Sequence, residues 1–150
     1  MNDYLRNHLV NVFFINNAEN LHVANNINKK APIEDVINQL NKVKQVWNRH
    51  QASLLKVSLI FGMNLNKAFR AFEFHKGAGT IDGNWDQFLK KNIHISAPYA
   101  RKLREIARRF SVFKKFYNLG ISFSEFYKRR DEIGNMLESD ASVKSFWEIP

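Results

Sequence analysis

The 150-residue sequence contains no cysteine. This absence excludes a disulfide framework, a thiol nucleophile and a cysteine-based zinc site, and it agrees with a reducing compartment. The sequence also has no uninterrupted apolar run long enough to span a bilayer, and its first residues lack the basic leader and the small-residue cleavage site of a secretory signal. We therefore expect an intracellular protein, in the cytoplasm or nucleus, with no membrane partner.

Signatures of catalysis and of metal binding are also missing. The five histidines are scattered, with no H-x-x-x-H or H-E-x-x-H pair, and no G-x-S-x-G motif appears. The glycine-rich stretch KGAGTIDGN at 76–84 lacks the residue order of a phosphate-binding loop and follows no strand pattern, so it is typical of a turn. We expect no catalytic residue, metal, cofactor or small-molecule substrate, and we do not expect an enzyme.

Acidic residues are few and unevenly placed. The chain has 23 Lys and Arg against 14 Asp and Glu, for a net charge of +9. Twelve of the basic residues lie between Lys90 and Arg130, where Glu105 and Glu125 are the only acidic ones, so the rest of the chain is close to neutral. A basic excess confined to one stretch favours a polyanionic partner. The alternative is an ordinary solvated helix face.

Two helices are predicted at the start of this basic stretch. Asn84 can cap the first, and Asn92 is placed to adopt the left-handed conformation that ends it. Ser96 can cap the second, with Pro98 in its first turn. Apolar residues of the second helix recur at helical spacing, at Tyr99, Ala100, Leu103, Ile106, Ala107 and Phe110. Because only a few residues separate the two helices, 84–110 is predicted to be a helix-turn-helix.

The residue order here resembles a known family. W-x-x-F-L from Trp85, a short turn and I-S-x-x-x-A-R-x-L-R-x-I-A from Ile95 are similar to the helix-turn-helix of phage and plasmid DNA-binding proteins, particularly partition proteins of the KorB and ParB type. An uncharacterised bacterial family has a similar W-x-x-[WF]-L, turn, S-x-x-T-A arrangement. The resemblance covers residues 54–110. It implies binding to double-stranded DNA, in transcription regulation, replication or partition, with the second helix in the major groove.

We predict that phosphate contacts supply most of the affinity and that the start of the second helix, from Ser96 to Arg101, lies nearest the base edges. Arg101 is the best candidate for guanine, and Arg101, Arg104 and Arg108 form one stripe expected to be exposed. The predicted DNA-binding residues are Lys90, Lys91, Ser96, Tyr99, Arg101, Lys102, Arg104, Arg108, Arg109, Lys114, Lys115, Lys128, Arg129 and Arg130.

Two other functions stay open at this point. One is a protein-interaction module whose basic face meets an acidic partner. The other is a binder of single-stranded nucleic acid or RNA, for which Tyr99, Tyr117 and Tyr127 would have to be exposed for stacking on bases.

The whole pattern predicts an all-α single domain of about six to eight helices without a β-sheet, with arms at 1–30 and 139–150. The first arm contains an expected amphipathic helix from Tyr4 to Phe13, and the second is expected to be a docking helix or an exposed arm. Residues 33–61 fit one long helix or two with a break near His50. We favour a central core helix there; the alternative is a homodimer seam, since helix-turn-helix proteins commonly bind two-fold sites.

Three further boundaries follow from the residues themselves. Gly62 and Asn64 are predicted to form a turn, after which Asn66 caps a helix that ends at Gly77. Ser111 is predicted to cap a further turn that Gly120 closes. Ser122 or Ser124 is then predicted to start one continuous helix with an apolar face that reaches Leu137.

Overall fold

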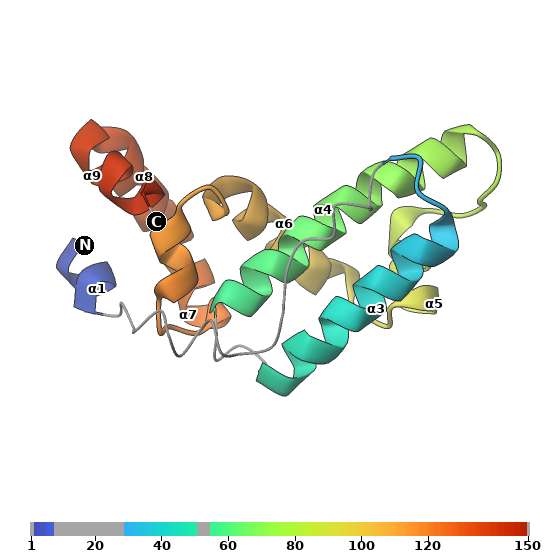
Figure 1. Cartoon of the computed structure of the whole chain (residues 1–150), viewed down its shortest axis with the longest axis horizontal. Helices are drawn as coiled ribbons and strands as arrows, with labels where there is room; N and C mark the ends of the chain where they lie inside the picture. Colours follow the sequence, from blue (N-terminus) through green and yellow to red (C-terminus); the bar gives the residue numbers. More distant parts are fainter. Residues whose placement is uncertain (1, 8–28, 51–54, 150) are drawn as a thin grey trace.

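The computed structural model describes residues 2–7, 29–50 and 55–149, which form eight α-helices and one 3-10 helix and contain no strand (Figure 1). The all-α prediction is confirmed. None of the helices in these ranges is both long and apolar enough to cross a membrane. In chain order the elements are α1 (Asn2–Asn7), α3 (Ile33–His50), α4 (Leu55–Gly77), α5 (Trp85–Asn92), α6 (Ala97–Phe110), η2 (Lys114–Asn118), α7 (Phe123–Lys128), α8 (Arg130–Ser139) and α9 (Ala141–Glu148).

The central element is α4. Six consecutive residues, Val57 to Gly62, are all buried, and because successive side chains on a helix point about 100° apart, the helix is covered on every side there. Its neighbours are α3, which runs beside it, and α6, which crosses it (Figure 1). The two polar residues that are buried within the described ranges, Ser58 and Asn64, are both hydrogen-bonded. Ser58 accepts a hydrogen bond from Trp47 Nε1 (3.2 Å), and Asn64 donates to the Ile60 carbonyl (2.9 Å).

The predicted turn at Gly62 and Asn64 is wrong, because both residues lie inside α4. Gly62 is needed for packing and not for a turn: a Cβ there would lie 2.2 Å from the Leu103 carbonyl oxygen of α6. The missing side chain lets the two backbones approach at their crossing. Asn66 is likewise not a cap but a mid-helix residue, and only the predicted end at Gly77 is confirmed.

Of the two possibilities for residues 33–61, the break near His50 is correct, since α3 ends at His50 and α4 begins at Leu55. α3 has acidic residues in its first turn, where the helix dipole favours negative charge, and buries Val36, Leu40 and Val43. Most of the predicted N-terminal amphipathic helix lies outside the described residues. Its described part, α1, buries Leu5, and its Tyr4 hydroxyl donates to the Glu125 carboxylate of α7.

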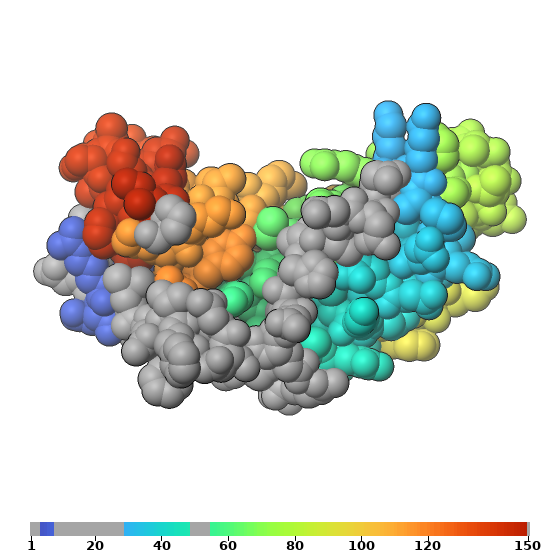
Figure 2. All heavy atoms as spheres, in the orientation of Figure 1, coloured from blue at the N-terminus to red at the C-terminus, as the bar shows by residue number. Residues whose placement is uncertain are grey.

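Helices α7, α8 and α9 lie at one end of an elongated molecule, and the C-terminal end of α4 lies at the other (Figure 2). The C-terminal tail is a docking helix, because Trp147 of α9 is fully buried with its ring centroid 5.1 Å from that of Phe116. Ser122 caps α7 as predicted. The prediction of one continuous helix from here to Leu137 is wrong, because the helix is interrupted at Arg129 (φ −99°, ψ 7°), between α7 and α8. Ser111 ends α6 instead of capping a new turn.

Candidate nucleic-acid interface

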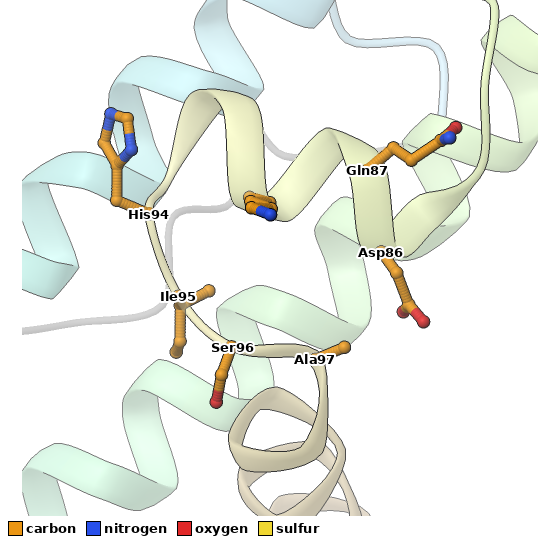
Figure 3. A pocket seen from close by; sticks show the side chains of 7 residues that line it. Asp86, Gln87, His94, Ile95, Ser96 and Ala97 are labelled. Atoms are coloured by element: carbon orange, nitrogen blue, oxygen red, sulfur yellow. The ribbon is translucent and has the colours of Figure 1, made fainter.

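The caps predicted for the two helices of 84–110 are confirmed. The Asn84 side chain accepts from Gln87 N (2.8 Å), and the Gln87 side chain accepts from Asn84 N (2.9 Å), which forms a capping box at the start of α5. Ser96 Oγ accepts from Tyr99 N (3.4 Å) at the start of α6, and Pro98 lies in the first turn. Four residues, 93–96, separate the helices, and their course is shown in Figure 3.

The left-handed residue of this connection is His94 (φ 58°), so the prediction that placed it at Asn92 is wrong. Asn92 continues α5, and its side chain donates to the Phe88 carbonyl one turn earlier (3.0 Å). His94 lies between two buried residues, Ile93 and Ile95, which fix the path of the chain from both sides. The His94 amide donates to the Leu89 carbonyl (2.8 Å), so the turn closes directly on the end of α5.

Helix α3 reaches this turn with polar side chains. Asn41 Nδ2 donates to the Asn92 carbonyl (3.0 Å), while Lys44 Nζ donates to the carbonyls of Ile93 (2.7 Å) and His94 (3.1 Å). These residues were absent from the predicted site. No local motif marks them, because their partners lie about fifty residues further along the chain.

The outer surface of α5 and α6 carries most of the free positive charge of the predicted site. Lys90 and Lys91 are exposed on α5, and Arg101, Lys102 and Arg108 are exposed on α6. Within the described part of the chain, Arg101 is the only one of these five in an ion pair, with Asp86 at 3.6 Å. That pair joins the two helices, and its side chains are 62% and 55% exposed, so it contributes at most about 1 kcal/mol and is easily exchanged for another partner.

The hollow between α5 and the start of α6 has a volume of about 590 Å³. Its lining residues are Asp86, Gln87, Lys90, His94, Ile95, Ser96 and Ala97 (Figure 3). Ser96, one of the predicted DNA-binding residues, is exposed here.

Arg104 departs from the predicted exposed stripe, because it is half-buried. Its Nε donates to Asn66 Oδ1 (2.8 Å), and its guanidinium lies 4.1 Å above the ring of Phe69. Burial lowers the pKa of Arg104, the nearby positive charge of Arg108 lowers it further, and Glu73 acts in the opposite direction. Arg104 therefore stabilises the contact between α6 and α4, and only Arg101 and Arg108 of the stripe are exposed.

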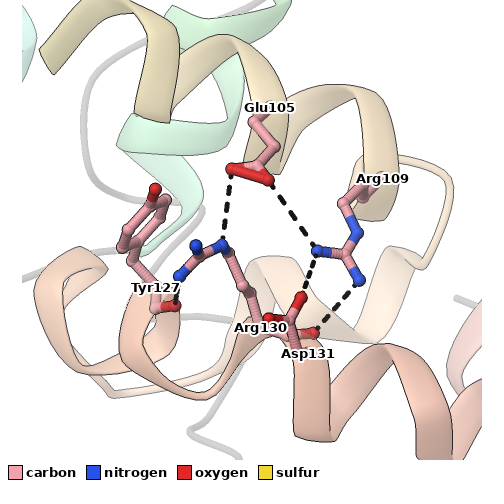
Figure 4. A network of polar contacts seen from close by, with 5 residues as sticks. All are labelled: Glu105, Arg109, Tyr127, Arg130 and Asp131. Atoms are coloured by element: carbon pink, nitrogen blue, oxygen red, sulfur yellow. Dashed lines mark hydrogen bonds and ion pairs between the residues drawn. The ribbon is translucent and has the colours of Figure 1, made fainter. Parts of the chain in front are cut away.

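Two further arginines of the predicted site join α6 to the helices that follow it. Arg109 lies 3.9 Å from Glu105 and 3.0 Å from Asp131, and Arg130 Nε lies 3.4 Å from the same Glu105 (Figure 4). Arg130 also donates to the Tyr127 carbonyl (3.0 Å), and its guanidinium lies 3.9 Å from the centroid of the Tyr127 ring. Because Glu105 lies within ion-pair distance of both arginines, it offsets their positive charge.

The remaining predicted basic residues form two groups. Lys115 and Arg129 are half-buried: Lys115 donates to the Ile149 carbonyl (2.9 Å), and Arg129 lies over the Tyr4 ring (3.9 Å) and 3.5 Å from Glu132. Lys114 and Lys128 are exposed. The basic surface expected to run on to Arg130 is thus interrupted after α6 by internal ion pairs.

The three tyrosines considered for stacking are half-buried. Tyr99 packs between Trp47 and Phe123, with ring centroids at 5.5 and 5.6 Å. The Tyr117 hydroxyl donates to the Ser111 carbonyl (2.8 Å), and burial raises its pKa to about 12. The Tyr127 ring is faced by Arg130 and by Lys102, whose Nζ lies 5.2 Å from its centroid. Stacking on single-stranded bases requires exposed rings, and none of these three rings is exposed.

No family model, curated protein or solved structure matches this chain.

Proposed function

We propose that the protein binds double-stranded DNA through α5 and α6, which act as a helix-turn-helix of the phage and plasmid type in transcription regulation, replication or partition. The observation that carries this proposal is the set of exposed cations on the outer surface of the two helices, Lys90, Lys91, Arg101, Lys102 and Arg108, of which only Arg101 has a carboxylate partner among the described residues. The other arginines of the region pair within the protein, and only Lys114 and Lys128 of the predicted site are exposed elsewhere, so the positive charge that can meet phosphate is concentrated on this surface.

The two ends of α6 have different roles in this proposal. Arg101 is in the first half of the helix, five residues after exposed Ser96, and a helix in the major groove meets base edges near its start. Its exposed pair with Asp86 holds the side chain near the start of the helix without burying it. Arg108 lies in the last turn and, with Lys90, Lys91 and Lys102, supplies phosphate contacts. Tyr99 is too covered to read a base with its ring.

The half-buried tyrosines favour duplex over single-stranded DNA or RNA, because a single-strand binder stacks bases on exposed aromatic rings. The test is a fluorescence-anisotropy titration of the full chain with duplex DNA, single-stranded DNA and RNA of one sequence over a series of salt concentrations. We expect duplex to bind most tightly, with a log–log salt slope of about −0.9 for each phosphate neutralised.

Variants locate the surface. The double substitution Lys102→Ala and Arg108→Ala should reduce the magnitude of the slope by about two, whereas Lys42→Ala, which removes an exposed lysine of α3, should leave it unchanged. Tighter binding to single strands, or equal losses from Lys42→Ala, would contradict the proposal. Binding to acidic polypeptides but to no nucleic acid would support the protein-interaction alternative.

A further inference from the structure

We infer that side chains of α3 help to set the position of α6, and that one of them, Lys44, is a positioning residue for base readout. The inference rests on the proposed function. Three residues of α3, Asn41, Lys44 and Trp47, follow one another at i, i+3 and i+6. They contact the last residue of α5, the connection between α5 and α6, and the first turn of α6, respectively. We call these three residues the bracket.

The strongest contact of the bracket is made by Lys44. Its ammonium donates to two consecutive carbonyls, those of Ile93 and His94, just after the last turn of α5. Hydrogen bonds from a charged donor are stronger than neutral ones, and a positive charge at the C-terminal end of a helix is favoured by the helix dipole. One side chain thus fixes both peptide groups that flank the left-handed residue.

The other two residues of the bracket act on either side of Lys44. Asn41 donates to the Asn92 carbonyl (3.0 Å), and the Trp47 ring meets the Tyr99 ring edge-on at 5.5 Å. The bracket is itself held against α4, because Trp47 Nε1 donates to Ser58 and Gln39 Nε2 donates to Asn64 (3.4 Å). The direction of α6 relative to the core is therefore fixed partly from α3.

Base readout and phosphate binding depend differently on that direction. Hydrogen bonds to base edges require side chains placed to within about 0.5 Å, whereas attraction to phosphate falls off slowly with distance. Lys44 uses its ammonium on carbonyls of the protein and is not free to meet phosphate. Its removal should therefore weaken binding to a preferred site and leave binding to random DNA nearly unchanged.

The experiment compares Lys44→Met with Lys42→Met in the full chain. Both variants lose one positive charge from α3, but Lys42 is exposed and lines a different hollow, with Asp35, Asn38 and Gln39. Duplex selected from a random pool by the wild type, and a scrambled duplex, are titrated at two salt concentrations. For Lys44→Met we expect an affinity loss of about tenfold or more on the selected site, less than about twofold on the scrambled one, and an unchanged salt slope. Lys42→Met should change neither affinity by more than about twofold.

Equal losses for Lys44→Met on both duplexes, with the slope reduced by about one, would mean that Lys44 contacts phosphate and would overturn the inference. So would the absence of any loss. If Lys44→Met does not fold, as judged by its circular dichroism, Asn41→Ala provides the same comparison through the neighbouring contact.

Hydrogen exchange separates this inference from the proposed function, because it needs no DNA. The His94 amide should exchange about ten times faster in Lys44→Met than in the wild type and at the wild-type rate in Lys42→Met. Unchanged exchange would refute the bracket even if the protein binds DNA. Faster exchange in a protein that binds no duplex would retain the bracket and refute the proposed function alone.

Discussion

Replacing Gly62 with alanine tests the crossing of α4 and α6, on which the placement of the candidate interface depends. At most positions within a helix, Gly→Ala stabilises the fold by about 1 kcal/mol, since alanine has the higher helix propensity. At this position the new Cβ would lie 2.2 Å from the Leu103 carbonyl oxygen and 2.7 Å from Ala107 Cβ. Both contacts belong to the neighbouring helix, and the closer one is backbone, which cannot rotate away.

The size of the effect follows from that overlap. Carbon and carbonyl oxygen approach to about 3.3 Å in favourable contacts, so the helices must separate by roughly 1 Å. A gap of that size forfeits up to about half of each dispersion contact at the crossing, where Leu103 and Ile106 are fully buried. Overpacking of a core costs about 1–3 kcal/mol and sometimes more, and for a clash with backbone we take about 3–4. After the propensity gain, we expect a net destabilisation of about 2–3 kcal/mol.

Urea denaturation followed by circular dichroism measures this change, and Gly77→Ala is the matched control. Gly77 also belongs to α4, but a Cβ there would meet nothing within 4 Å, so its replacement should be neutral or stabilising by up to about 1 kcal/mol. The melting temperature of Gly62→Ala should be lower than that of the wild type by roughly 4–12 °C for a chain of this length. A Gly62→Ala protein as stable as the wild type would refute the close crossing.

Three other variants test separate parts of the structure. Trp147→Ala should destabilise the fold by about 3–5 kcal/mol in urea denaturation, while Ile149→Ala, at an exposed position beside it, should change stability by less than about 0.5 kcal/mol; equal effects would contradict docking of α9. Burial raises the pKa of Tyr117 to about 12, so as pH rises the unfolded chain loses this proton before the folded one does. The contribution of Tyr117 to the free energy of unfolding is therefore complete below about pH 10 and should decline by about 1–2 kcal/mol towards pH 12. Tyr117→Phe should lack that part of the decline, and a curve parallel to the wild type's would rule out this origin. Glu105→Gln leaves Arg109 and Arg130 without their shared carboxylate, so it should tighten duplex binding about three- to tenfold regardless of sequence; unchanged or weaker binding would count against the internal neutralisation.

Sequence patterns were sufficient where the cause of a structure is local. The cap at Asn84, the cap at Ser96 and Pro98 in the first turn all depend on residues within three positions of one another. The apolar face of α6 was predicted correctly for the same reason, since Ala100, Leu103, Ile106, Ala107 and Phe110 are all buried.

The predictions failed where the cause is a distant partner. Gly62 has the local signature of a turn, but its lack of a side chain serves a contact with residues more than forty positions away. Arg104 belongs to a regular basic stripe, and only its pairing with Asn66 of another helix shows that it is half-buried. Lys44 was missed for the same reason, because the sequence of a helix does not distinguish a lysine that is free in solvent from one that donates to a distant turn.

The central proposal, that α6 reads duplex DNA, is tested most directly by comparing Arg101→Ala with Arg108→Ala on a selected duplex and a scrambled one at two salt concentrations. Both side chains are exposed on α6, but Arg101 is near its start and Arg108 is in its last turn. We predict that Arg101→Ala loses about 1–3 kcal/mol on the selected duplex and much less on the scrambled one. Arg108→Ala should weaken binding to both alike and reduce the salt slope by about one. Equal, sequence-independent losses for both variants would show a non-specific basic surface, and no loss for either would contradict DNA binding by this helix.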